Sequence, residues 1–126
     1  MPSPAEVAAR TYIAAWQEPD AAARARLIEA CFAEDARIVA PGSAIHGRAG
    51  LARAIGELLA DPRGLTARLV SAIDVQGPMF RFRSVVEDRE GCVVFDGFDA
   101  AEVDASGRIM VLLAFSGAPP APPPGR

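Results

Sequence analysis

An isolated phenol and an isolated carboxylic acid occur in segments of this sequence that are otherwise apolar. Tyr12, the only tyrosine, shares a stripe of helical spacing with Ile13 and Trp16. A phenol on such a stripe bonds a neighbouring group or offers its hydroxyl to a ligand. Asp99 lies within the β-type run 92–104, on a face of small and apolar residues. Burial of that acid would raise its pKa and leave a neutral group able to donate a hydrogen bond.

Both residues also have structural interpretations. Tyr12 can be a core tyrosine whose hydroxyl bonds a backbone carbonyl. Asp99 can form an ion pair with Arg81 or Arg83 of the neighbouring run, or a local bulge can turn it outward. Arg81 and Arg83 alternate with Phe80 and Phe82, and the alternation leaves open which face points inward. Arginines lining a pocket would favour an anionic ligand.

His46, the only histidine, precedes Gly47 and a predicted helix. It either caps that helix or points into a cavity, where an imidazole can act as a base near neutral pH. With one histidine, and with Cys31 and Cys92 far apart, the sequence predicts no metal site. Since no phosphate-binding loop or other cofactor motif is visible, we also expect no organic cofactor.

The first half of the chain is predicted to be mainly helical. Ser3 can cap a helix over residues 4–17, and Asp20 can cap a second one over residues 21–33. A short strand is expected over residues 36–40, and a third helix after Gly47. The run 61–64 then predicts a turn.

The second half is predicted to form strands. Four β-rich runs, separated by turns that contain Gly77, Gly91 and Gly107, indicate an antiparallel meander; the runs cover residues 66–75, 79–87, 92–104 and 108–116. Helices followed by such a sheet are typical of the α+β class.

The last predicted strand is apolar on both faces, since Leu113 and Phe115 alternate with Leu112 and Ala114. A sheet with one face in water should not show this pattern. Either a second copy of the chain covers the outer face, as a homodimer, or the strand lies beneath the third helix. We favour the homodimer.

A set of motifs along the chain resembles the SnoaL-like and ketosteroid isomerase-like branch of the nuclear transport factor 2 (NTF2)-like superfamily. The motifs are residues 10–16 with Asp20, residues 27–36, Gly47 with its helix, and residues 104–109, and the resemblance covers residues 5–117. It implies a cone-shaped α+β fold, in which three N-terminal helices pack on a curved, mostly antiparallel sheet and enclose an apolar pocket.

The resemblance also assigns roles to residues. Tyr12 and Asp99 match the oxyanion-hole tyrosine and protonated acid of the steroid isomerases, where two donors stabilise an enolate. Those enzymes carry their proton-shuttling aspartate where this chain has Ala40, so His46 is the remaining candidate base. We therefore expect Tyr12, Asp99 and His46 to be catalytic. The residues expected to contact the substrate are Trp16, Phe32, Phe82, Val86 and Phe115.

Three functional hypotheses follow. The first is a cofactor-independent isomerase- or cyclase-type acid–base enzyme acting on a small apolar carbonyl compound, polyketide- or steroid-like. The second is a non-catalytic ligand-binding or dimerisation domain of the same fold, favoured by Ala40. The third uses Asp99 with Arg81 or Arg83 to activate water on an epoxide or lactone.

The length, net charge and apolar runs of the chain fit one small domain. The 126 residues suffice for a single unit over residues 1–117, followed by a proline-rich tail over residues 118–126 that we expect to be disordered. The net charge of −3 without a basic stripe argues against a nucleic-acid partner. The longest apolar run, residues 109–115, is far short of the roughly 20 residues of a membrane span. No export signal is visible, so we expect the protein in the cytoplasm.

Overall fold

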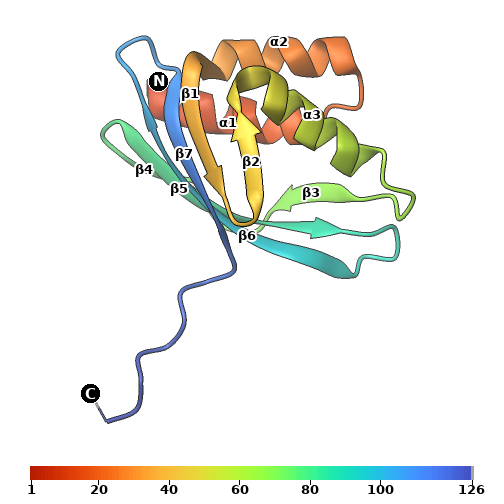
Figure 1. Ribbon diagram of the computed structural model, residues 1–126. Coiled ribbons are helices and arrows are strands. Elements are labelled where there is room, and N and C mark those ends of the chain that lie inside the picture. The colour runs from red at the N-terminus through yellow and green to blue at the C-terminus, as the bar shows by residue number, and fades with distance from the viewer. Residues whose placement is uncertain (126) are drawn as a thin grey trace.

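The computed structural model describes residues 1–125, and in this part of the chain three helices pack on one face of a curved seven-stranded sheet (Figure 1). The strand order is β2-β1-β7-β6-β5-β3, with the short strand β4 also paired to β5. This arrangement confirms the predicted α+β cone.

The helices begin where the sequence places their caps. Ser3 Oγ accepts a hydrogen bond from the Glu6 amide at 3.2 Å, and Asp20 Oδ2 accepts one from the Ala23 amide at 2.8 Å. These bonds satisfy amides that have no partner within the helix. The helices are α1 (Pro4–Trp16), α2 (Ala21–Cys31) and α3 (Gly47–Leu59).

The strand after α2 is longer than predicted. β1 (Phe32–Ala40) begins directly after α2, because Phe32 pairs with Ile109 of the last strand and both are fully buried. The sequence also gave no sign of β2 (Ser43–His46), which pairs antiparallel with β1 across a turn at Gly42. Gly42 has φ +68°, a conformation that favours glycine.

The predicted meander is present. The antiparallel partners are β5 (Met79–Glu87), β6 (Val93–Val103) and β7 (Ile109–Ser116). The run predicted as one strand over residues 66–75 is two short strands, β3 (Thr66–Leu69) and β4 (Asp74–Gln76), and both pair with β5. β7 then pairs in parallel with β1, which joins the two ends of the domain.

The core lies between the three helices and the concave face of the sheet. Its largest fully buried side chains come from both halves of the chain and include Phe32, Ile55, Phe80 and Leu112. Residues 117–125 leave the sheet as an extended segment (Figure 1). Arg126, the end of the predicted tail, lies outside the described residues. None of the helices in residues 1–125 has the length and apolarity that crossing a membrane requires.

Candidate functional site

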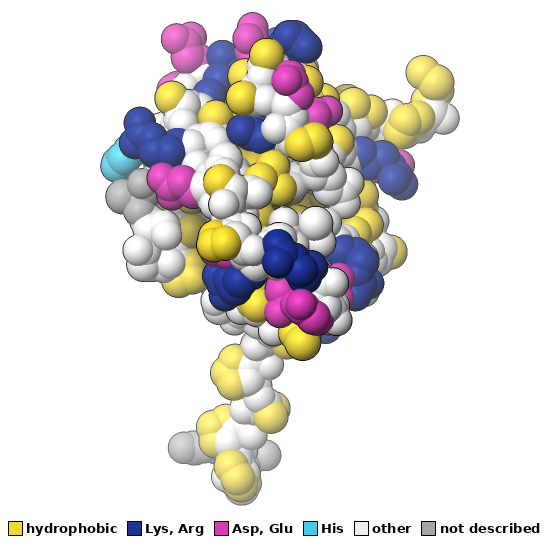
Figure 2. All heavy atoms as spheres, turned by 90° about the vertical axis from the view of Figure 1, so that its right-hand side faces the viewer, with side chains coloured by type: hydrophobic (Ala, Val, Ile, Leu, Met, Phe, Trp, Pro, Cys, Tyr) yellow, Lys and Arg dark blue, Asp and Glu magenta, His cyan; other side chains and the backbone are white. Residues whose placement is uncertain are grey.

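A cavity of about 510 Å³ lies between the helices and the concave face of the sheet. It is lined mainly by apolar side chains of α1, α3 and strands β1, β3, β5, β6 and β7. Figure 2 views the molecule from the side where α3, β3 and the β5–β6 hairpin end, and apolar side chains lie there in a recess bordered by charged ones. The size suits a small organic ligand.

Tyr12 and Asp99 meet inside this cavity. The sheet register sets Asp99 opposite Phe82 on one side and Ala114 on the other, so these three residues share the face beneath α1. Tyr12 comes down from α1 with 3% of its surface exposed. Its hydroxyl lies close enough to the Asp99 carboxyl for each group to shift the pKa of the other. Two groups that are 87 residues apart in sequence are thus adjacent in an apolar pocket.

The surroundings shift the pKa values of both groups upward. Burial raises the pKa of the Asp99 carboxyl from 3.8 to about 6, although the nearby Tyr12 hydroxyl, a potential hydrogen-bond donor, acts in the opposite direction. Burial, followed by the negative charge of Asp99, raises the pKa of Tyr12 well above its usual value. At pH 7 Tyr12 is therefore protonated, whereas Asp99 is largely ionised. The sequence predicted a neutral Asp99 carboxyl, whereas a pKa of about 6 leaves the carboxyl mostly ionised at pH 7.

Trp16 adds a third polar group next to Tyr12 and Asp99. It lies one helical turn after Tyr12, with the two ring centroids 6.4 Å apart and their planes at 84°. Its indole N–H acts to lower the pKa of Tyr12. An indole N–H can only donate, so the Tyr12 proton remains available to Asp99 or a ligand.

Of the residues expected to contact a ligand, Trp16, Phe82 and Val86 line the cavity. Phe32 is completely buried and packs edge-on against Tyr12, with ring centroids 5.4 Å apart. It supports Tyr12 from behind and is not among the lining residues.

The sequence assignment of Phe115 to the pocket is corrected by the register. Phe115 pairs with Phe98 on the outer face of the sheet and is 55% exposed, while Ala114 points into the cavity. A register shift before Val103 breaks the alternation at the start of β7, so Ile109 turns inward with Leu112.

His46 is also placed away from the cavity. It occupies the N-cap position of α3, but its side chain makes no capping bond and is exposed. It pairs with Arg37 on the outer face, whereas the adjacent pair Ile38 and Ile45 lines the cavity. The structure therefore does not bring His46 to Tyr12 and Asp99.

The two arginines of β5 lie on the outer face as well. Arg81 Nε is 2.7 Å from Asp74 Oδ2, and Arg83 Nη2 is 2.9 Å from Asp96 Oδ2. Asp99 faces the opposite side of the sheet, so the alternative of an Asp99–arginine ion pair is not what the structure shows. The hypothesis of a water-activating charged dyad loses its geometric basis with it.

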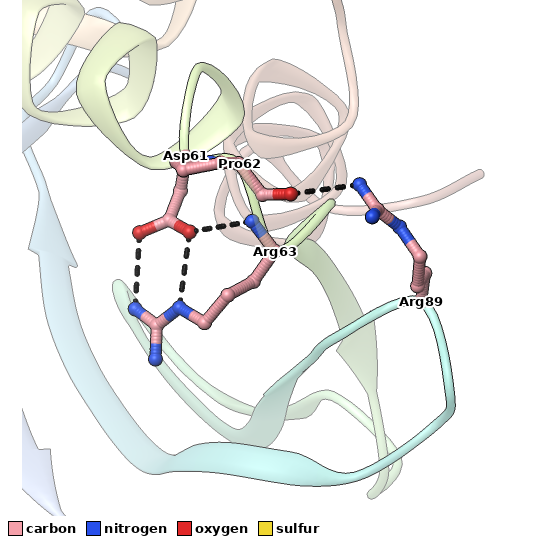
Figure 3. Close-up of polar contacts among 4 residues, drawn as sticks. All are labelled: Asp61, Pro62, Arg63 and Arg89. Carbon is pink, nitrogen blue, oxygen red and sulfur yellow. Dashed lines mark hydrogen bonds and ion pairs between the residues drawn. The ribbon is translucent and has the colours of Figure 1, made fainter.

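The mouth of the cavity has charged residues that the sequence analysis treated only as a turn. Arg63 lines the mouth and binds Asp61 through two nitrogens, Nε and Nη2, each 3.0 Å from a carboxyl oxygen. This bonding lowers the pKa of Asp61 to about 2. Arg89 of the β5–β6 hairpin donates to the Pro62 carbonyl at 2.8 Å and ties the hairpin to this turn (Figure 3).

A second charged pair at the mouth follows the same pattern. Arg68 lines the cavity and is bound by Glu87 at 2.8 Å. Because Arg63 and Arg68 each hold a carboxylate, the mouth offers little net positive charge to an anion. Among residues 1–125, His, Cys, Asp and Glu side chains form no group of three or more suited to hold a metal ion.

A family model described as the SnoaL-like domain matches residues 9–112. The chain belongs to the SnoaL-like family. This membership, together with the fold, confirms the resemblance to the NTF2-like superfamily. Among the curated proteins, none matches this SnoaL-like chain.

Solved structures of similar proteins agree with the family. A SnoaL-like family protein from Agrobacterium tumefaciens, provisionally described as an isomerase, is 29% identical with a TM-score of 0.81, over 91% of this chain and 98% of that one. A protein from Sinorhizobium meliloti, provisionally described as a polyketide cyclase, is 21% identical with a TM-score of 0.66, over 86% and 93%. Another so described, from Bacillus cereus, is 17% identical with a TM-score of 0.73, over 90% and 74%. The last two share the fold with this SnoaL-like chain.

Proposed function

We propose that this SnoaL-like protein is a cofactor-independent acid–base enzyme that moves a proton next to the carbonyl group of a small, largely apolar cyclic ketone. The observation that carries the proposal is the placement of Tyr12 and Asp99 near each other in the wall of the cavity. The structural neighbours described as an isomerase and polyketide cyclases support the same class of chemistry.

Each group has a distinct part in the proposed step. The Asp99 carboxylate accepts a proton from the carbon beside the carbonyl, and the C–H electron pair forms the enolate double bond. The Tyr12 hydroxyl donates to the oxygen on which the negative charge develops. The protonated Asp99 then returns the proton to the same or another carbon. In a cyclic ketone the oxygen and the adjacent C–H lie side by side, so neighbouring groups can reach both.

Asp99 suits the base role because of its pKa. With a value of about 6, the group is mostly ionised at pH 7 yet basic enough to hold a proton transiently. Ala40, which lines the cavity, matches the position of the base in the steroid isomerases. In this chain Asp99, which matches the position of the protonated acid in the steroid isomerases, would then act as the base that Ala40 cannot supply. His46 would have no part in the step.

Deuterium exchange into 2-tetralone, a two-ring ketone, tests this function without knowledge of the natural substrate. We expect wild-type protein at pH 7 to accelerate exchange at the carbon between carbonyl and ring, followed by proton NMR. Tyr12→Phe, which loses the donor to the enolate oxygen, should slow the protein-dependent exchange by about 10²-fold. Arg81→Gln, on the outer face, is the matched control and should exchange like wild type.

The alternative function, binding without turnover, is favoured by Ala40 and gives a different result in the same experiment. Wild-type protein would then bind 2-tetralone, visible as quenching of the single tryptophan Trp16, without accelerating exchange. Exchange at the buffer rate with the cavity occupied would thus contradict the enzyme and leave a ligand-binding protein.

We also infer a homodimer formed through the outer face of the sheet. Neighbouring strands expose an apolar row there, with Val39, Leu113 and Phe115 at 45%, 41% and 55% exposure. Phe98 and Ala100 of β6 continue the row. Such a patch at the centre of an open sheet suits a two-fold symmetric contact with a second copy.

A charge in this row should separate the copies. Phe115→Glu is expected to give a monomer in sedimentation velocity at concentrations where wild type is a dimer, since a carboxylate cannot be buried there unpaired. Val7→Glu, at an exposed apolar residue on α1, should remain dimeric. A monomeric wild type, or a dimeric Phe115→Glu variant, would contradict the proposed interface.

A further inference from the structure

Two consecutive residues of β6, Val94 and Phe95, both line the cavity. In a regular strand successive side chains point to opposite faces. The register explains the exception, because Val86 pairs with Phe95 and Glu87 pairs with Val93, which leaves Val94 as an extra residue. Such a bulge redirects side chains, and bulges often occur beside functional sites. Here it brings an additional apolar side chain to the mouth.

The Phe95 ring lies along its own strand, over Gly97. A Cβ atom added at Gly97 would be 3.1 Å from Phe95 Cε1 and 3.7 Å from Cδ1. The ring can therefore occupy this position because residue 97 has no side chain. Gly97 is the inward-facing neighbour of Asp99 on this face of β6. The ring of Phe95 therefore extends from the mouth toward the reactive pair.

The same ring is only partly held by its surroundings. Phe95 is 44% exposed, although Gly97 beneath it is buried and both line the cavity. An aromatic side chain with one face in solvent can change rotamer without disturbing a packed core. Rotation about its χ1 angle would carry the ring away from Gly97 and lengthen the cavity along β6.

We propose that Phe95 is the residue that sets which ligand sizes this cavity accepts, with its ring, seated on Gly97, acting as a gate at the mouth. The proposal rests on the proposed function, because it takes the bottom of the cavity to be the reactive end. With the ring on Gly97, the free path along β6 from Asp99 is roughly 7 Å, enough for one six-membered ring. With the ring turned out, the path to position 95 is roughly 13 Å, enough for two fused rings.

Two phenols of different size test the gate. Both 4-nitrophenol and 4-nitro-1-naphthol imitate an enolate and quench tryptophan emission, so Trp16 in the cavity wall reports their binding. Phe95→Ala should improve naphthol binding relative to phenol binding by about tenfold, the size of effect expected when one group stops obstructing an apolar pocket. Stopped-flow mixing should show faster association and dissociation of both ligands.

The contact with Gly97 supplies a sharper test. Gly97→Ala should displace the ring and shift the size preference in the same direction as Phe95→Ala, but less. In the Phe95→Ala background, Gly97→Ala should no longer shift the preference toward the larger ligand, since the contact it disturbs is gone. Val93→Ala is the control, because Val93 is an exposed residue of the same strand that does not line the cavity. Thermal unfolding would verify that all variants fold.

The outcomes separate the gate from the proposed function. A Phe95→Ala variant whose size preference and rates remain within about twofold of wild type would contradict the gate, whatever the exchange assay gives. A Gly97→Ala effect that persists without the Phe95 ring would contradict it too. If wild type binds neither phenol, both proposals fail. If the size preference changes as expected but ketone exchange is absent, the gate holds and the enzyme does not.

Discussion

Asp99→Asn should lower the protein-dependent exchange of 2-tetralone by about 10²- to 10⁴-fold at pH 7, the range expected for loss of a general base. The substitution preserves size and keeps a partner for Tyr12, but it removes the group that accepts the proton. Proton NMR of the exchanging carbon measures the change. Asp96→Asn is the matched control, because Asp96 lies three residues earlier on the outer face, paired with Arg83. An equal loss of exchange rate in both variants would mean that Asp99 supports the fold and takes no part in the proton transfer.

The pH profile of the same reaction follows from the raised pKa of Asp99. A base must be ionised, so exchange by wild type should rise with pH and level off above about 6. The effect on stability has the opposite sign. An acid whose pKa is higher in the folded state stabilises the fold at low pH, and this contribution is lost as pH rises from about 4 to 6.

Asp99→Asn should therefore be more stable than wild type at pH 7, by up to about 3 kcal/mol, with the difference absent below about pH 4. Urea unfolding at both pH values measures it. A variant that is inactive and more stable would identify Asp99 as a site where stability is sacrificed for reactivity. A variant less stable than wild type at pH 7 would contradict the desolvated, ionised carboxylate.

Phe32→Ala should reduce the free energy of unfolding by about 3–5 kcal/mol, the range for a fully buried aromatic residue. Phe32, the first residue of β1, packs against the ring of Tyr12 within the core, and the remaining structure cannot close the gap completely. Urea or thermal unfolding measures the loss. Because typical domains have only about 5–15 kcal/mol in total, this variant should be marginally folded.

The matched control is Phe115→Ala, at another of the three phenylalanines that were expected to contact the ligand. Phe115 is 55% exposed on the outer face, so at protein concentrations low enough to keep the chain monomeric its truncation should change stability by no more than about 0.5 kcal/mol. A large loss for Phe115 and a small one for Phe32 would reverse the assignment made from the register.

The sequence was a good guide to elements and to the central pair of the site. Ser3 and Asp20 marked helix starts through their capping oxygens, and turn glycines separated the strands of the meander. Tyr12 and Asp99 stood out because a polar group in an apolar row needs a reason.

The sequence could not show which face of each strand points toward the cavity and which points outward. Alternation divides β5 and β7 into two sets of residues, but only pairing with neighbouring strands decides which set points inward. Arg83 and Phe115 therefore took their places from the register with β6. The bulge at Val94 and the early start of β1 at Phe32 depend on long-range pairing too, which no local pattern reveals. His46 had a suitable chemical type but the wrong strand face.

The parallel pairing of β1 with β7 has a consequence for how the molecule is made. β7 lies between β1 and β6, so until residues 109–116 have been synthesised these two strands each have an unpaired edge. The pairing spans most of the chain, and contacts of such sequence separation form late and slowly. During translation the nascent protein therefore has open, apolar strand edges that can join other chains, and it should depend on chaperones most strongly just before β7 emerges from the ribosome.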